Sequence, residues 1–373
     1  METLAGESVD LIVTSPPYPM IEMWDPVFGD LDSEITTCFR EARYEAAFDL
    51  MHAALGKVWA ECERVLKSGG LLCVNVGDAT RTFDATGFRL WPNGARTQAA
   101  LAKLGLDQLP GILWRKPTNS PTKFMGSGMI PPNAYATLEH ERILIFRKGG
   151  KRRVDRREAR YESAYFWEER NRWFSDVWTE LTGASQALGK KGGSAPPEEE
   201  EEELRERSAA FPLALPLRLI LMFSIRGDRV LDPFLGTGMT ALAAALTGRN
   251  AVGYEIDPAF RPAVRNRLFE VPPRSRALSR ERLAAHRAFL REREGACKYE
   301  NEHYGFGVVT KQERRLRLYD AASVEEVGAD RFSFSYRPHR RREPEPEQPR
   351  EVEETPPAGG KPAGDRPAAR GSS

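Results

Sequence analysis

The feature that most constrains the fold is a strand, a long helix and a second strand within the first 78 residues. Residues 11–13, Leu-Ile-Val, form a short apolar run of the kind that is buried on both faces in a parallel sheet. Apolar residues then recur at steps of four and three through residues 44–65, which predicts one buried helix face that Gly69-Gly70 would end. Residues 71–76 predict a second buried strand. This order indicates a right-handed parallel crossover and hence an α/β fold.

The first strand leads directly into Ser15, Pro16, Pro17 and Tyr18. The two prolines lack an N–H and stiffen the chain, so their neighbours' carbonyls are free to accept hydrogen bonds. In an open α/β sheet, ligands bind at this end of the strands. The Ser15 hydroxyl, the Pro16 carbonyl and the Tyr18 ring together suit a planar ring with an exocyclic amino group, such as a nucleobase. A proline turn that only ends a strand would have the same sequence, so the motif needs support from elsewhere.

A second motif, Asp-Pro-Phe-Leu-Gly-Thr-Gly-Met-Thr at residues 232–240, lies between a short apolar strand and an alanine-rich helix. This is the pattern of a nucleotide-binding βα unit, in which glycine lets the backbone approach a ligand. The next strand, 250–255, ends at Glu255, 23 residues after Asp232. An acidic residue at about this interval of 20 residues typically meets a ribose diol. Because the third glycine of the dinucleotide motif is missing, the pattern argues against NAD and for a ligand without a pyrophosphate.

Charge is distributed unevenly along the 373 residues, although the net charge is only +1. Residues 147–160 hold eight Lys or Arg against two acidic residues, and residues 261–293 hold ten against three. The glutamate run 198–203 and a Glu/Pro-rich tail offset them. If those acidic segments are disordered, the folded part is basic, as expected for a protein that binds a polyanion.

The four cysteines are widely separated, with no Cys-x-x-Cys pair, which argues against a zinc site and against a disulfide framework. The N-terminus has no signal sequence, and no apolar run approaches the roughly 18 residues of a membrane span. We therefore expect a cytoplasmic protein without a metal or a membrane anchor.

The middle of the chain contains candidate contacts to a nucleic acid. Residues 116–132 predict a loop, residues 148–183 interleave basic with aromatic side chains, and residues 184–203 resemble a flexible insert. For any single residue, the simpler interpretation is a solvated helix whose aromatics pack inward. The side chains of suitable type for phosphates or base edges are those of Lys116, Asn119, Lys123, Arg152, Arg153, Arg156 and Arg157.

Taken together, these motifs resemble the DNA methyltransferases that modify exocyclic amino groups. Ser15-Pro16-Pro17-Tyr18 is similar to their catalytic motif, and residues 232–238 with Glu255 are similar to their S-adenosylmethionine site. Phe211-Pro212 and the segments 114–117 and 139–147 also resemble parts of the family. The catalytic motif precedes the cofactor motif, which is the β-type circular arrangement, and the resemblance covers roughly residues 8–265. It implies a Rossmann-like methyltransferase fold, with helices on both faces of a mostly parallel sheet and an irregular target-recognition segment.

The resemblance also implies roles for the site residues. Catalysis would rest on Ser15, Pro16, Pro17 and Tyr18, acting on a base flipped out of double-stranded DNA. The cofactor would be held by Phe211, Pro212, Asp232, Pro233, Phe234, Gly236, Thr237, Gly238, Thr240 and Glu255. No Pro-Cys pair is present, which disfavours methylation of a ring carbon through a cysteine nucleophile.

The target base and the function class each have an alternative. Serine at position 15 is more often associated in this family with N4-methylcytosine and aspartate with N6-methyladenine, so we expect cytosine and keep adenine as the alternative. A DNA-binding module that has lost catalysis is the alternative from another class. A cognate restriction endonuclease could accompany such an enzyme in the cytoplasm of a bacterium or archaeon, near the nucleoid.

The expected division of the chain follows from these motifs. We expect a catalytic half at 1–147, target recognition and an acidic insert at 148–208, and a cofactor half at 209–270. A basic extension at 271–336 and a disordered tail at 337–373 would follow. Two features depart from the family: only nine residues precede Asp10, where an acidic contact to the cofactor adenine is usual, and Met239 stands where threonine is common.

Overall fold

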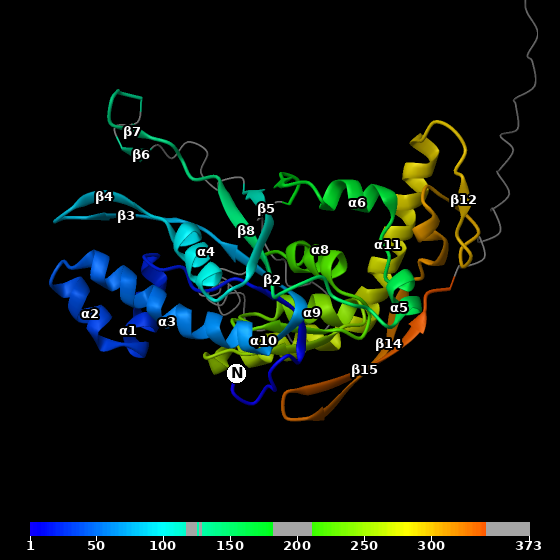
Figure 1. Ribbon diagram of the computed structural model, residues 1–373, viewed down its shortest axis with the longest axis horizontal. Coiled ribbons are helices and arrows are strands. Elements are labelled where there is room, and N and C mark those ends of the chain that lie inside the picture. Colours follow the sequence, from blue (N-terminus) through cyan, green and yellow to red (C-terminus); the bar gives the residue numbers. More distant parts are fainter. Residues whose placement is uncertain (117–124, 127–128, 182–210, 341–373) are drawn as a thin grey trace, which may run out of the picture. The chain divides into compact units, whose positions relative to one another are not determined.

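The computed structural model describes residues 1–116, 125–126, 129–181 and 211–340 (Figure 1). A seven-stranded sheet has the strand order β11-β10-β1-β2-β8-β5-β9. Its strands are β1 (Val9–Thr14), β2 (Leu66–Val76), β5 (Asp107–Arg115), β8 (His140–Arg147), β9 (Val177–Trp178), β10 (Arg229–Asp232) and β11 (Asn250–Gly253). All neighbours pair in parallel except β8, which is antiparallel to both β2 and β5. The predicted, mostly parallel sheet is therefore confirmed.

The first crossover unit has the predicted order, with one boundary displaced. Helix α3 (Tyr44–Val65) ends at Val65, and β2 begins at Leu66, so Gly69-Gly70 lies within the strand and does not end the helix as expected. Gly69 has a φ of +77°, and a Cβ there would lie 2.4 Å from the backbone of Arg152. The glycine is needed because another segment of backbone approaches β2 closely at this point.

Helices cover both faces of the sheet, as expected (Figure 1). On one face, Val9 and Ile12 of β1 pack with α1 (Asp25–Leu31), α2 (Ser33–Arg40), α3 and α4 (Asn93–Lys103). On the other face, Leu11 and Val13 pack with α8 (Ala214–Phe223), α9 (Met239–Leu246), α10 (Arg261–Phe269) and α11 (Val271–Glu292). All six residues of β1 are buried, because this central strand is covered on both faces. Four of them are apolar, and the buried polar side chains of Asp10 and Thr14 are paired with Lys67 and Asp232.

Several elements lie outside the sheet. Two of them are antiparallel hairpins, β3 (Ala79–Phe83) with β4 (Gly87–Trp91) and β14 (Tyr319–Gly328) with β15 (Arg331–Pro338). The remaining short elements are η1 (Glu22–Trp24), β6 (Met125–Gly126), β7 (Ala134–Tyr135), α5 (Arg157–Glu162), α6 (Trp167–Trp173), η2 (Pro258–Phe260), β12 (Tyr299–Glu300), β13 (Gly307–Val308) and η3 (Lys311–Arg315).

Residues Met1–His339 form one compact unit, to which the predicted basic extension belongs. Helix α11 lies in this extension and packs against α9 and β14. The predicted insert at 184–203, most of the predicted loop at 116–132 and the tail beyond residue 340 lie outside the described residues. Among the helices that the structure describes, none is both long and apolar enough to cross a membrane.

Candidate active site

The two sequence motifs leave the sheet side by side at the carboxyl ends of neighbouring strands. Strands β1 and β10 pair in parallel, with Ile12 opposite Leu231, and the Ser-Pro-Pro-Tyr motif begins directly after Thr14. The Thr14 hydroxyl donates a 2.6 Å hydrogen bond to the buried carboxylate of Asp232 at the end of β10. This hydrogen bond joins two segments that are more than 200 residues apart in sequence at the carboxyl ends of their strands.

A cavity of about 730 Å³ lies between these motifs. All four predicted catalytic residues line it, together with Phe211, Pro233, Phe234, Gly236, Thr237 and Glu255 from the predicted cofactor set. The cavity wall is mainly apolar and includes side chains of α1 and α3. A mostly apolar pocket with a few placed polar groups is the usual form of a site for a small organic ligand.

The other predicted cofactor residues shape the loop around the cavity. Asp232 accepts hydrogen bonds from Thr14 and from the Phe234 amide at 3.1 Å, and burial raises the pKa of its carboxyl to about 6. Thr240 donates to the Val13 carbonyl at 3.3 Å, which ties α9 to β1. Gly238 adopts a φ of +83° at the start of α9, where a Cβ would lie 3.0 Å from Val264. Pro212 lies beside Phe211 just before α8 and is not part of the cavity wall.

Glu255 supplies an acidic group at the glycine loop. Its carboxylate accepts the Gly236 amide at 2.7 Å and the Asp257 amide at 2.9 Å. Gly236 itself has a φ of +50°, and nothing lies within 4 Å of the position that a Cβ would take. The buried Thr237 hydroxyl has no hydrogen-bond partner among the residues that the structure describes. An open glycine cradle, a carboxylate and an unsatisfied hydroxyl beside an apolar wall fit S-adenosylmethionine, which carries a ribose diol, an amino acid group and an adenine.

The catalytic motif contacts Glu141 of β8 and Asn75 of β2, and Glu141 in turn contacts Lys116, which directly follows β5. The Ser15 hydroxyl lies 3.0 Å from the Tyr18 hydroxyl, which lies 3.1 Å from a carboxylate oxygen of Glu141 on β8. Asn75 of β2 donates to both Tyr18 at 3.0 Å and Glu141 at 2.5 Å, and the Lys116 ammonium binds the other Glu141 oxygen at 2.6 Å. Burial and the charge of Glu141 raise the pKa of Tyr18 well above its usual value, so its phenol stays protonated.

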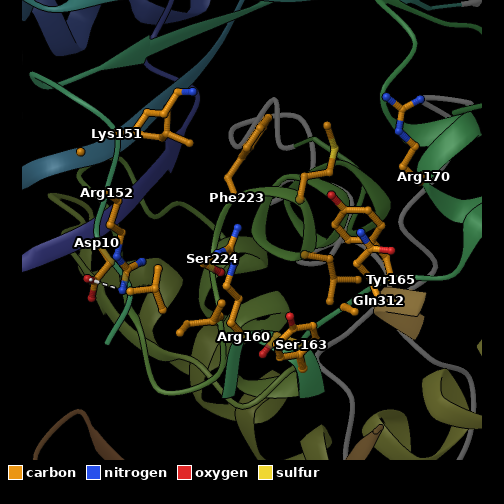
Figure 2. A pocket seen from close by; sticks show the side chains of 18 of the residues that line it. Asp10, Lys151, Arg152, Arg160, Ser163, Tyr165, Arg170, Phe223, Ser224 and Gln312 are labelled. Carbon is orange, nitrogen blue, oxygen red and sulfur yellow. Dashed lines mark ion pairs between the residues drawn. The ribbon is translucent and has the colours of Figure 1, made fainter. Parts of the chain in front are cut away.

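Two of the predicted DNA contacts, Arg152 and Arg156, lie near the amino ends of β1 and β10, and Arg152 lines an open groove of about 1100 Å³ (Figure 2). Arg152 binds both carboxylate oxygens of the fully buried Asp228 at 2.6 and 2.8 Å and also lies 3.2 Å from Asp10. Arg156 binds the same Asp228 at 2.8 Å. Asp10 lies near the amino end of β1, and Asp228 directly precedes β10. The two arginines therefore neutralise acids at the amino ends of the strands, whereas Ser15 follows the carboxyl end of β1.

The remaining predicted DNA contacts are differently placed. Lys116 is ion-paired with Glu141 beside the catalytic motif, while Asn119 and Lys123 lie outside the described residues. Arg153 and Arg157 are exposed, and the Arg157 guanidinium lies over the Tyr161 ring. A DNA contact by any of these residues stays a prediction.

Sequence reasoning missed part of the cavity wall and the groups behind Tyr18. Met23, Trp24, Val27, Phe28 and Leu31 line the cavity from η1 and α1. Trp24, Val27, Phe28 and Leu31 follow the i, i+3, i+4, i+7 spacing of a helix, a pattern that would have identified this apolar face. Glu141 and Asn75 gave no such signal, because a single polar residue at the end of an apolar strand is common.

The fold and the site together define a class: a Rossmann-like methyltransferase whose cofactor loop faces a Ser-Pro-Pro-Tyr motif across one cavity. The chain belongs to the DNA methylase family N6_N4_Mtase, whose family model matches residues 9–265.

Known proteins of similar sequence and structure support the assignment of the chain to this family. The type II methyltransferase M.MthZI of Methanothermobacter thermautotrophicus is 48% identical over 340 residues, which cover 90% of this chain and 92% of that protein. M.MjaI of Methanocaldococcus jannaschii, also a type II methyltransferase, is 46% identical over 280 residues, covering 72% and 88%. The crystal structure of a DNA modification methylase from Thermus thermophilus, complexed with S-adenosyl-L-methionine, has a TM-score of 0.54 and 30% identity, covering 71% of this chain and 87% of that one. The chain is thus an S-adenosylmethionine-dependent DNA methyltransferase of the family that modifies cytosine N4 or adenine N6.

Proposed function

We propose that this enzyme transfers a methyl group to the exocyclic N4 of a cytosine that is flipped out of the duplex. The observation that carries the proposal is the placement of Ser15, Pro16 and Tyr18 in the same cavity as the glycine loop at Gly236. Two acceptors beside an aromatic ring suit an amino group on a planar base. The geometry serves cytosine and adenine equally, and the assignment to cytosine rests on serine at position 15, which resembles the N4-cytosine enzymes.

In this mechanism the protein aligns two reactants and polarises one of them. S-adenosylmethionine supplies, when bound, a methyl group on a positively charged sulfur. Phe211, Phe234 and Glu255 would hold the cofactor, while Ser15 Oγ and the Pro16 carbonyl accept the two amino hydrogens of the base. These hydrogen bonds draw the nitrogen lone pair out of conjugation with the ring and toward the methyl carbon. The Tyr18 ring supports the extruded base, and alignment with oriented dipoles provides most of the rate enhancement.

Nucleoside mass spectrometry tests the proposed base. DNA incubated with the enzyme and labelled S-adenosylmethionine should contain labelled N4-methylcytosine, and Ser15→Ala protein should yield far less. Label in N6-methyladenine would overturn the assignment to cytosine. Folded enzyme that binds cofactor and DNA but leaves both bases unmodified would favour a DNA-binding module without catalysis.

We further infer that methylation is sequence-specific and protects DNA from a type II restriction endonuclease. This inference is supported by the two archaeal relatives, both type II methyltransferases, which match 72% or more of the chain. Mapping of modified positions on genomic-length DNA should return one short recognition sequence. Methylation scattered without a common sequence would contradict the inference.

A further inference from the structure

A chain of hydrogen bonds leads from the catalytic serine to a carboxylate that no sequence motif singled out. Ser15 Oγ, Tyr18 Oη and Glu141 Oε2 follow one another at 3.0 and 3.1 Å. The Glu141 side chain is only 13% exposed, so its charge acts in a medium that screens it weakly. Its position depends on the fold. Because β8 runs antiparallel to β2 and β5, its first residues lie beside the carboxyl end of β2, near the catalytic motif.

The carboxylate fixes the direction of this chain. An ionised carboxylate can only accept hydrogen bonds, so the single phenolic hydrogen of Tyr18 is donated to Glu141. Asn75 Nδ2 donates to Tyr18 Oη at 3.0 Å and to Glu141 at 2.5 Å, which agrees with that direction. Ser15 must then donate its own hydrogen to Tyr18 Oη. The lone pairs of Ser15 Oγ are thereby left for an amino hydrogen of the substrate.

On this basis, and resting on the proposed amino methylation, we propose that Glu141 is a positioning residue that makes Ser15 an obligate acceptor and receives the proton released by the reaction. The amino nitrogen forms its bond to the methyl carbon while the carbon–sulfur bond breaks, and that bond's electron pair stays on sulfur. The methylated nitrogen then carries one excess proton. It passes to Ser15 Oγ as the Ser15 proton moves to Tyr18 Oη and the Tyr18 proton moves to Glu141.

The groups of the site account for every proton that moves in this step. The base ends as a neutral methylamine, both hydroxyls are restored, and Glu141 ends as a carboxylic acid. The other Glu141 oxygen lies 2.6 Å from the Lys116 ammonium, whose side chain is 40% exposed. The proton can leave to solvent on this side, which returns Glu141 to its ionised state for the next turnover.

Glu141→Gln tests the role of the carboxylate while keeping its size. We expect single-turnover methyl transfer to slow by about 10²-fold or more, as for loss of a general base, with unchanged affinity for S-adenosylmethionine. Glu141→Asp should recover part of the rate. Glu139→Gln is the matched control, because Glu139 is also ion-paired to an exposed cation, Arg115 at 3.1 Å, but does not contact Tyr18.

Tyr18→Phe provides a second, independent variant that leaves the carboxylate in place. It keeps the ring and removes the hydroxyl that links Ser15 to Glu141, so its loss should match that of Glu141→Gln, and the double variant should lose little more. The proposal would be overturned by a double variant whose loss of rate equals the product of the two single losses, or by a Glu141→Gln rate within about threefold of wild type. If Glu141→Gln does not fold, a near-normal Tyr18→Phe rate is equally decisive. Wild-type protein that methylates no base refutes the proposed function, whereas methylation of adenine leaves the relay standing.

Discussion

A substitution of Ser15 can test its proposed catalytic role separately from folding, because its hydroxyl makes few contacts within the fold. Its one side-chain hydrogen bond within the described residues is to Tyr18, at 3.0 Å. We expect Ser15→Ala to reduce single-turnover methylation by about 10²-fold, the usual cost of one group that stabilises the reacting centre. The dissociation constant for S-adenosylmethionine, measured by equilibrium titration, should change less than about twofold. Equal losses in rate and cofactor affinity would contradict the role given to Ser15.

At this scale, sequence alone predicts the residues whose chemistry is local. Ser15 and Tyr18 are recognisable because proline geometry and the end of a strand are both written in consecutive residues. Glu141 and Asn75 are not, since they reach Tyr18 only through the order of three strands in the sheet. Arg152 shows a second limit: a basic residue in a basic segment predicts a DNA contact, which stays a prediction, but the sequence did not indicate that its guanidinium binds a buried aspartate.

Among the secondary-structure elements, the turn between α8 and β10 depends on one buried acid. Asp228 accepts the Ile225 amide at 2.8 Å and is neutralised by Arg152 and Arg156. Without this carboxylate, the guanidinium groups of Arg152 and Arg156 would stay in place and lose their shared acidic partner. We expect Asp228→Ala to lower the free energy of unfolding by about 3–5 kcal/mol, as measured by urea denaturation.

Arginine variants separate this structural role from DNA binding. Arg152→Ala should also destabilise the protein markedly, whereas Arg153→Ala should change the free energy of unfolding by less than about 0.5 kcal/mol, because Arg153 is exposed. An Arg152→Ala protein of wild-type stability that binds DNA more weakly would show that Arg152 acts on DNA and not on the turn.

Elements with a strong apolar period were predictable, and those with mixed patterns were not. A run of consecutive apolar residues predicts strand β1, and apolar residues spaced three to four apart predict helix α3. The end of α3 was misplaced because the approach of Arg152 to Gly69 comes from a distant segment. In β15, Phe332, Phe334 and Tyr336 alternate with polar residues, a period of two that indicates a strand once the neighbouring β14 is known.

For the compact unit as a whole, a group of charges joins α6, in the segment expected to recognise DNA, to α11, in the C-terminal extension. Arg282 of α11 binds Glu169 through two hydrogen bonds of 2.7 and 2.8 Å, and both side chains are largely buried. His286, one turn further along α11, lies 3.0 Å from the Glu168 carboxylate and 3.0 Å from the Gly307 carbonyl. Both partners only accept hydrogen bonds, so the ring must carry a proton on each nitrogen to satisfy them.

The protonation of His286 predicts how stability depends on pH. Burial opposes the charge, but the hydrogen bonds to Glu168 and Gly307 outweigh it and raise the pKa of His286 above 6.5. A group whose pKa is higher in the folded state stabilises the fold fully below its unfolded pKa of about 6.5 and loses that effect as the pH rises through the folded value. We therefore expect the urea midpoint of the wild type to fall as the pH is raised from about 6 through the value at which folded His286 loses its proton. His286→Gln should be less stable at the acid end of this range and should lack the fall, whereas His303→Gln, at an exposed site, should retain it. Parallel pH profiles for the wild type and His286→Gln would show that the ring is neutral in the folded protein and that other groups hold α6 to α11.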